Sequence, residues 1–365
     1  MIGRWVALWL CCAALWVNAA ERKTKAVILV TADGLRWQEI FNGIDARLMN
    51  EKSAGMNEHG SAALRDRLWK ETPEARREAL MPFFWKELVS AGIVLGNVTK
   101  KSSVRVANAY RVSYPGYSEI LTGRTQDDVI RGNREIRNPT PTVLEFLRDK
   151  LALTPPQVAL FASWDVFHFI GEHTEGAITI NAGYEAADGE ASARVKELSA
   201  LQFAARTPWD EARHDYVTFE LALDYLRRVH PRVLHISFDE TDDWAHMRRY
   251  DRVLEAIQYF DSTLETLWKT LQSMPEYRDQ TTLVVTCDHG RGDTLKDFSD
   301  HGAKVDGAEQ IWLAIAGPDT PVRGEAVETE SFYQRDIAPT ILELMGVPVG
   351  SYAGVEGHVI GAAVK

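Results

Sequence analysis

The hydrophobic positions of this chain fall into short continuous runs that are separated by longer segments of mixed character. Strands that are buried on both faces have this pattern, whereas half-buried strands alternate apolar and polar residues. We therefore predict strands, each covered by other elements on both faces, within residues 26–33, 92–99, 157–163, 233–240, 281–290 and 311–318.

Helical patterns lie between these runs. The clearest covers residues 248–271, and shorter patterns cover residues 140–151 and 332–346. In the longest one, apolar residues recur at steps of four and three, as in an amphipathic helix, at Val253, Ile257, Phe260, Leu264, Leu267 and Leu271. Alternating strands and helices predict an α/β fold, a doubly wound and mostly parallel sheet flanked by helices.

Two charged or glycine-rich segments interrupt this order, at residues 44–80 and 170–215. Neither has enough apolar residues for a core of its own, so we interpret both as surface insertions. We expect residues 20–365 to form one catalytic domain that carries them.

The first residues have the layout of a secretory signal peptide. Arg4 precedes a continuous apolar run, and Val-Asn-Ala follows it. The run is shorter than the roughly twenty apolar residues of a membrane-spanning helix. We expect residues 1–19 to be removed and the protein to be secreted, into a bacterial periplasm, without a stable membrane anchor. A lipoprotein attached through Cys11 or Cys12 is the alternative, although the leucine before them fits it poorly.

Removal of that segment leaves Cys287 as the only cysteine, so no intramolecular disulfide is expected. It also removes Arg4 and takes the formal charge from −11 to −12. An acidic chain with no basic run is a poor candidate for binding a nucleic-acid polymer or an anionic membrane. A small phosphate ester held by local cations remains compatible with this charge. The oligomeric state is left open.

Acidic residues and histidines follow the predicted strands. They are Asp33 after the first, the run 239–243 with His246 after the fourth, and Asp288-His289 after the fifth, with Asp300-His301 soon afterwards. In an open α/β sheet such residues gather at one edge. Carboxylates placed together repel one another unless cations neutralise them, so we predict divalent metal. Mixed Asp/His ligation without cysteine suits zinc, and also manganese or iron.

The stretch SYPGYSEILTGR, residues 113–124, predicts a short helix that begins at a hydroxyl and ends at Gly123. Ser113 is expected to be its N-cap, with Pro115 in the first turn. Two interpretations follow. Ser113 is either a plain helix cap or a nucleophile at a helix end that favours anions.

Taken in their order along the chain, these motifs resemble those of the alkaline phosphatase superfamily. The resemblance is greatest to its nucleotide pyrophosphatase/phosphodiesterase-like branch and related bacterial phosphoesterases. That family has Asp-Gly after the first strand, then Ser or Thr two residues before Pro, then Asp-x-x-x-His, Asp-His and a final His-Gly. This chain matches them with Asp33-Gly34, Ser113-Tyr114-Pro115, Asp242 to His246, Asp288-His289 and His301-Gly302.

The resemblance implies a phosphoric ester hydrolase with two divalent ions, most simply Zn²⁺, with Mn²⁺ as the alternative. One ion would be held by Asp33, Ser113, Asp288 and His289, and the other by Asp242, His246 and His301. His358, in EGHVIG, is the alternative to His301. Ser113 would attack phosphorus and form a phosphoseryl intermediate, and Asn133 would point at a phosphoryl oxygen.

Other residues have a plainer interpretation beside a functional one. A distal phosphate or carboxylate could be gripped by Arg124, Arg131, Arg134 or Arg291, each also explicable as a solvated arginine. Cys287 and His235 are expected to be core residues of strands.

Three related enzyme classes fit less well. A sulfatase needs arginine at the position that Tyr117 has here. A phosphoglycerate mutase of this superfamily is cytosolic and has a large inserted domain, which the predicted signal peptide argues against. A phosphoethanolamine transferase needs several membrane helices, which the sequence does not predict. A catalytically inactive metal-binding module is a further alternative. Monoester against diester preference and the natural substrate stay open.

Overall fold

The computed structural model describes residues 22–56, 61–328 and 330–365. The predicted signal peptide, with Cys11 and Cys12, lies outside the described residues. Within those residues no helix has both the length and the apolar character needed to cross a membrane.

Eight strands form the main sheet, in the order β10-β2-β9-β7-β1-β6-β4-β5. Every neighbouring pair is parallel except those of β9, which runs antiparallel to both β7 and β2. The strands are β1 Ala26–Ala32, β2 Gly92–Leu95, β4 Val158–Ala162, β5 Thr179–Ala182, β6 Val233–Phe238, β7 Thr281–Thr286, β9 Leu313–Ala316 and β10 Gly324–Glu325.

The predicted α/β fold with a mostly parallel sheet is confirmed, and each of the six predicted runs contains a strand of this sheet. The sequence did not reveal the direction of β9, because a short continuous apolar run looks the same in a parallel and an antiparallel strand. A second, three-stranded sheet was also missed. It is made of β3 Ser103–Arg105, β8 Gln310–Ile311 and β11 Ser331–Tyr333.

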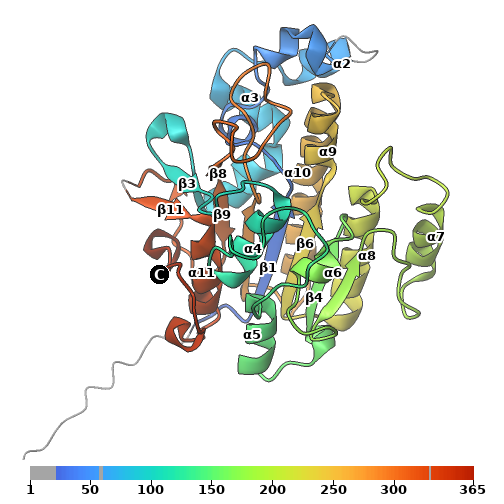
Figure 1. Ribbon diagram of the computed structural model, residues 1–365, viewed down its shortest axis with the longest axis vertical. Coiled ribbons are helices and arrows are strands. Elements are labelled where there is room, and N and C mark those ends of the chain that lie inside the picture. The colour runs from blue at the N-terminus through green and yellow to red at the C-terminus, as the bar shows by residue number, and fades with distance from the viewer. Residues whose placement is uncertain (1–21, 57–60, 329) are drawn as a thin grey trace, which may run out of the picture.

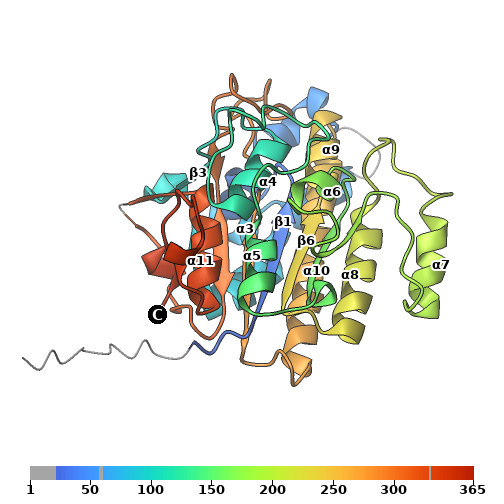
Figure 2. The ribbon, with the colours of Figure 1, turned by 60° about the horizontal axis from the view of Figure 1, so that its bottom comes forward.

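Helices cover both faces of the main sheet (Figures 1 and 2). One layer contains α4 Ser113–Thr122, α5 Val143–Lys150, α6 Phe167–Ile170 and α11 Ile337–Leu344. On the opposite face, α8 Asp215–Val229 and α10 Tyr250–Ser273 both contact β6, where the ring of Phe238 packs against Phe219 and Phe260. The helices predicted within residues 140–151, 248–271 and 332–346 are confirmed as α5, α10 and α11.

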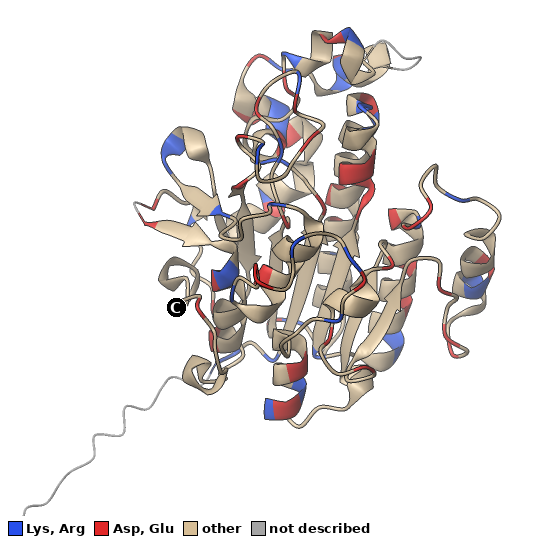
Figure 3. Cartoon of the chain, viewed as in Figure 1, with Lys and Arg blue, Asp and Glu red and all other residues tan. Residues whose placement is uncertain are grey.

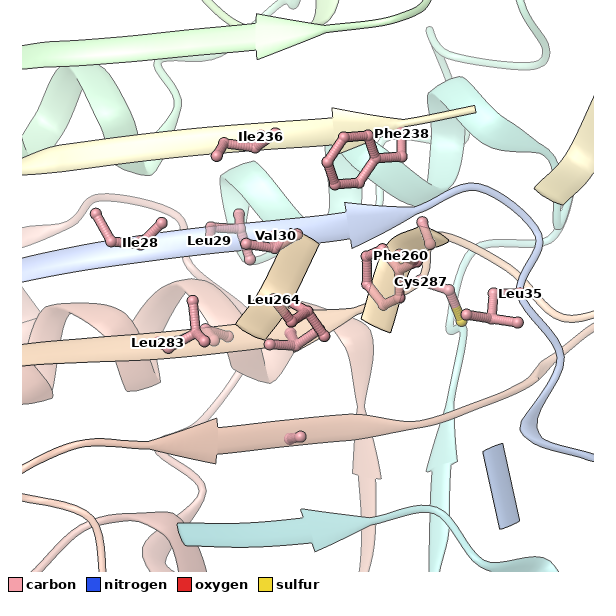
Figure 4. Packing of buried hydrophobic residues seen from close by; sticks show 14 of the residues in the cluster. Ile28, Leu29, Val30, Leu35, Ile236, Phe238, Phe260, Leu264, Leu283 and Cys287 are labelled. Atoms are coloured by element: carbon pink, nitrogen blue, oxygen red, sulfur yellow. The ribbon is translucent and has the colours of Figure 1, made fainter. Parts of the chain in front are cut away.

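The core lies between the central strands and these layers. Figure 4 shows Phe260 and Leu264 of α10 beside Val30 and Leu283 of the sheet, all of them buried. Burying a side chain of this size contributes about 1.5–3 kcal/mol. The two predicted core residues are confirmed: Cys287 is a buried free thiol, and burial lowers the pKa of His235 to about 3.

The segments predicted as insertions lie at the periphery of the molecule in Figure 1. Residues 44–80 contain α2 Ser61–Leu68 and α3 Pro73–Leu80. Residues 170–215 contain β5, which extends the edge of the main sheet, and α7 Ala193–Leu201.

Candidate metal and catalytic site

The carboxyl ends of three neighbouring strands carry the acidic residues of the site. Asp33 follows β1, and β1 lies between β6 and β7. The loop after β6 leads directly into α9 Glu240–His246, while Asp288 follows β7. Figure 3 shows the acidic residues along α9, above the ends of these strands. Parallel pairing of the three strands is therefore what brings distant parts of the chain together.

An inner cluster consists of Asp33, Ser113, Asp288 and His289. Its four residues are at most 5% exposed. The Nε2 atom of His289 lies 3.3 Å from Asp33 Oδ1, 3.3 Å from Asp288 Oδ2 and 3.4 Å from Ser113 Oγ. Its Nδ1 atom lies 3.0 Å from the Gly290 carbonyl oxygen, and donation to that oxygen leaves Nε2 free to act as a ligand.

An outer cluster consists of Asp242, His246 and His301. His246 Nε2 lies 3.0 Å from Asp242 Oδ2 and 3.0 Å from His301 Nε2. Asp242 also reaches the inner cluster, since its Oδ1 is 3.8 Å from His289 Nε2. The rings of His289 and His301 stack at 3.9 Å. Potential ligand atoms thus converge in two overlapping sets: Asp242, His246 and His301, and Asp33, Asp242 and His289.

Two glycines make this convergence possible. Gly34 has φ of 57°, and a Cβ atom there would lie 2.5 Å from Asp242 Oδ1. A Cβ atom on Gly116 would lie 2.3 Å from the Asp288 carbonyl oxygen. A larger residue at either position would push α9 or α4 away from the strand ends.

The N-terminus of α4 corrects one prediction. Ser113 is not the N-cap: Val112 has that position, with extended backbone and no side-chain capping bond, and Ser113 is the first helical residue. The cap is supplied from elsewhere, because Asn133 Oδ1 accepts the Tyr114 N–H at 2.9 Å. Gly123 ends the helix in the left-handed conformation, as predicted. With capping done by Asn133, the hydroxyl of Ser113 turns toward His289.

The same geometry reduces the number of free amides at this helix end. The Tyr114 N–H is taken by Asn133, Pro115 has none, and the Gly116 N–H bonds to the Val112 carbonyl. Within the part of the chain that the structure describes, the Ser113 N–H is left without an acceptor. An anion at this end would therefore meet one backbone donor, together with the Asn133 side chain, which lines the same cavity.

The residues present fit divalent cations. Asp33 Oδ1 and Asp288 Oδ2 are buried and have no hydrogen-bond partner among the described residues. Burial raises the pKa of both carboxyl groups well above the usual range, and repulsion by the nearby carboxylates raises it further. Burial also lowers the pKa of His301. A metal ion would supply the missing partner for each of these atoms and would favour charged carboxylates and neutral imidazoles.

Neighbouring side chains hold the clusters in place. The hydroxyl of Tyr117 donates to Asp33 Oδ2 at 3.2 Å. Asp215, at the start of α8, accepts the N–H groups of Asp239 and Glu240 and so fixes the first turn of α9. Burial alone would raise the pKa of Asp242, but Arg291 holds it well below its usual range.

The four candidate arginines differ in where they lie. Arg291 is 2% exposed and bonds to the Asp242 side chain and the Ser299 carbonyl, so it supports a cluster residue from within the protein. Arg124 bonds to the Ala353 carbonyl. Arg131 lines a second cavity beside the site, and Arg134 is exposed.

Of the two alternative histidines, the structure brings His301 into the site. His358 is exposed, and its N–H donates to Asp336. It belongs to neither set of converging ligand atoms.

The structure adds residues that sequence reasoning did not place. Trp164, Trp209, Asp210 and Glu211 line the cavity above Ser113. Asp239 and Asp243 line it as well, and burial and mutual repulsion raise the pKa of Asp239. The acidic run 239–243 was visible in the sequence, but nothing local to Trp164 or Trp209 connects them with the strand ends.

Comparison with known proteins gives a family match over part of the chain. Residues 211–349 match the model of the Metalloenzyme superfamily. Two curated relatives are 2,3-bisphosphoglycerate-independent phosphoglycerate mutases. That of Gracilaria tenuistipitata var. liui is 24% identical over 136 residues, which cover 36% of this chain and 24% of the relative. The enzyme of Thermomicrobium roseum is 28% identical over 123 residues, which cover 31% of this chain and 21% of the relative. The matches thus span about a quarter or less of these relatives' length.

Solved structures match over nearly the whole chain at low identity. The alkaline phosphatase PafA has a TM-score of 0.61 and 10% identity, covering 95% of this chain and all of that chain. A 2-O GAG sulfatase has a TM-score of 0.58 and 14% identity, and the match covers 92% of this chain and 73% of the sulfatase chain. The phosphonate monoester hydrolase of Silicibacter pomeroyi has a TM-score of 0.54 and 16% identity, and the match covers 92% of this chain and 76% of the hydrolase chain. These similarities establish a shared fold.

Proposed function

We propose that the chain is a member of the alkaline phosphatase superfamily of metalloenzymes, and that it is a two-metal hydrolase of phosphoric esters that uses Ser113 as its nucleophile. The observation that carries the proposal is the position of the Ser113 hydroxyl. It lies 3.4 Å from His289 Nε2, on the same side as the unpartnered oxygens of Asp33 and Asp288. A serine that merely began a helix would have no reason to be held there.

The residues divide into two ligand sets. The inner cluster would hold one divalent ion and the outer cluster the other, with Asp242 within reach of both. When bound, the ions supply Lewis-acid stabilisation of the charges that develop on the attacking and leaving oxygens. Zinc suits the mixed carboxylate and imidazole donors, and manganese is the alternative.

Residues of the chain account for the remaining steps. Ser113 Oγ attacks phosphorus in line with the ester oxygen that departs, a phosphoseryl bond forms and the alcohol is released. Water then attacks the phosphoseryl group, the Ser113 hydroxyl is regenerated and phosphate or its monoester leaves. The Ser113 N–H and the Nδ2 group of Asn133 are donors that would orient the non-bridging oxygens.

We also propose that the enzyme is exported to a bacterial periplasm and acts there on small phosphate esters. The basic start, apolar run and small residues of positions 1–19 support export. Buried Tyr117 supports phosphate over sulfate as the transferred group. Its hydroxyl contacts Asp33 from below the site, at the position where a sulfatase would have arginine.

A hydrolysis panel tests the proposal. The metal-loaded protein is given p-nitrophenyl phosphate, bis-p-nitrophenyl phosphate, nucleotides and p-nitrophenyl sulfate, with Ser113→Ala in parallel. We expect turnover of at least one phosphate ester, with the alanine variant slower by several orders of magnitude. Turnover of the sulfate alone would show a sulfatase. Full metal content without any turnover would support an inactive metal-binding module.

A further inference from the structure

The cavity above Ser113 has an aromatic and acidic wall facing the clusters. Its volume is about 370 Å³, within the range of small-molecule sites. Ser113, Asn133 and the outer cluster are part of its lining. Further lining residues come from two other segments of the chain, Trp164 and Trp209–Ala212.

Backbone pairing builds this wall onto the main sheet. Just beyond β4, the Asp165 N–H donates to the Glu211 carbonyl at 3.1 Å, and the Arg213 N–H donates to the Ser163 carbonyl at 3.0 Å. The buried Trp164 ring donates from Nε1 to Glu211 Oε2 at 3.3 Å. Segment 209–212 is therefore a fixed surface of the pocket.

The second tryptophan is also held in place. The Trp209 ring packs edge-on against the ring of Trp244 in α9. The ring centroids are 4.9 Å apart and the angle between the ring planes is 82°. Trp244 in turn donates to Glu240 Oε2 at 3.2 Å. Since α9 also supplies Asp242 and His246, the aromatic wall and the outer cluster are positioned by the same helix.

The lining of this cavity is acidic beyond the residues of the two clusters. Among the described residues that line it there are five carboxylates and neither lysine nor arginine. Only Asp242 belongs to a cluster. Burial raises the pKa of Asp239 and of Asp243, so we assign the negative charge of the wall to Asp210 and Glu211. Burial and the nearby Glu211 raise the pKa of Asp165, a further sign of crowded carboxylates on this side. Another anionic group would be repelled here, and an organic cation attracted.

A second cavity, of about 470 Å³, adjoins the first and has the reverse charge. The two share Asn133 and His301. Its lining includes Arg131 and Lys304, and no carboxylate among the described residues. The cavity that contains Ser113 thus has an acidic, aromatic lining, and the cavity beside it has a basic one.

We propose that the substrate is a phosphodiester with an ammonium group on one of its two alcohols. The ammonium group binds against Trp164 and Trp209 beside Asp210 and Glu211, and the other substituent extends toward Arg131 and Lys304. This inference rests on the proposed function and adds the substrate class. Tryptophan faces bind quaternary and primary ammonium groups, and flanking carboxylates strengthen that attraction. A diester carries one negative charge, so the acidic wall repels it less than a dianionic monoester.

Two nearly isosteric substrates test the charge preference directly. They are p-nitrophenyl phosphorylcholine and p-nitrophenyl 3,3-dimethylbutyl phosphate, which differ by one positive charge. We expect kcat/KM of the metal-loaded enzyme to favour the choline diester by roughly tenfold, mainly through KM. In Asp210→Asn/Glu211→Gln the preference should fall several-fold, because kcat/KM for the choline diester falls more than kcat/KM for the dimethylbutyl diester. The matched control is Glu190→Gln/Glu197→Gln, an exposed acidic pair of the same insertion that lines neither cavity.

The outcomes separate this inference from the function on which it rests. Equal kcat/KM for the two diesters, or an unchanged preference in the Asp210/Glu211 variant, overturns the ammonium site while hydrolysis stands. If neither diester is hydrolysed, the same comparison is made by calorimetry with phosphorylcholine and 3,3-dimethylbutyl phosphate. Tighter binding of phosphorylcholine that depends on Asp210 and Glu211 then supports the ammonium site even though the proposed hydrolysis fails, and equal binding overturns it.

Discussion

At the scale of single residues, the candidate site depends on side chains that act through others. Asn133 caps α4 and thereby releases Ser113 from that role. Tyr117 bonds to Asp33 from beneath the inner cluster. Neither contact follows from local sequence, because each joins groups that only the folded chain brings together.

Replacing Tyr117 by Phe should weaken metal binding and leave the fold intact. The lost hydrogen bond orients Asp33, and such outer partners are worth about 10–100-fold in metal affinity. The measurement is a competition titration with a chelator that reports zinc affinity. Tyr114→Phe is the control, since that hydroxyl bonds to backbone carbonyls of Ile136 and Phe169 and reaches no cluster residue. Equal zinc affinity in Tyr117→Phe and wild type would contradict the positioning role.

Two substitutions of Asn133 separate its capping from its place in the cavity. Asn133→Asp keeps an oxygen for the Tyr114 N–H but adds negative charge where phosphate would bind. We expect wild-type thermal stability and a fall in kcat/KM of about tenfold or more. Asn133→Ala should lose about 0.5–2 kcal/mol of stability as well. If Asn133→Asp retained wild-type kcat/KM, Asn133 would be a cap only.

At the scale of elements, the strand ends and the helices that follow them position the site. The continuous apolar runs predict these strands well, because burial on both faces leaves a clear signal. Asp242 and His246 are four residues apart, a spacing that places both side chains on one face of a helix, and both lie in α9. The cavity wall could not be predicted, because Trp164 and Trp209 meet through pairing between distant segments.

The loop that leads into α4 depends on one buried carboxyl group. Glu119 accepts the N–H groups of Ala107, Asn108 and Arg335, and burial raises its pKa from 4.5 to about 7. The folded protein therefore binds this proton more tightly than the unfolded chain. The corresponding stability is present below pH 4.5 and is lost as the pH rises through about 7.

Glu119→Gln isolates this effect. The difference in unfolding free energy, wild type minus variant, should decrease as the pH rises from 4.5 to about 7. Urea unfolding of the metal-free proteins at several pH values measures it, and groups shared by both proteins cancel in the difference. A difference that grew with pH would mean that the accepted N–H bonds outweigh burial.

At the scale of the whole molecule, metal binding should couple the two clusters to folding. We expect about two divalent ions per chain after purification without chelator. His246→Ala should lose about one ion, because it belongs to the outer cluster alone. Asp242→Asn should affect both ions, because Asp242 lies within reach of both sets. Elemental analysis decides this, and unchanged metal content in both variants would contradict the grouping.

The proposed function requires that Ser113 becomes phosphorylated during turnover. Wild type and Ser113→Ala are mixed with a phosphate ester that the panel identifies, quenched in acid within the first turnover, digested and analysed by mass spectrometry. We expect a phosphoryl group, with the second substituent still attached where the substrate is a diester, on the peptide that contains Ser113 in wild type. We expect none on the corresponding alanine peptide, with both proteins folded. Hydrolysis by the alanine variant at the wild-type rate, or phosphate trapped on another residue, would contradict it.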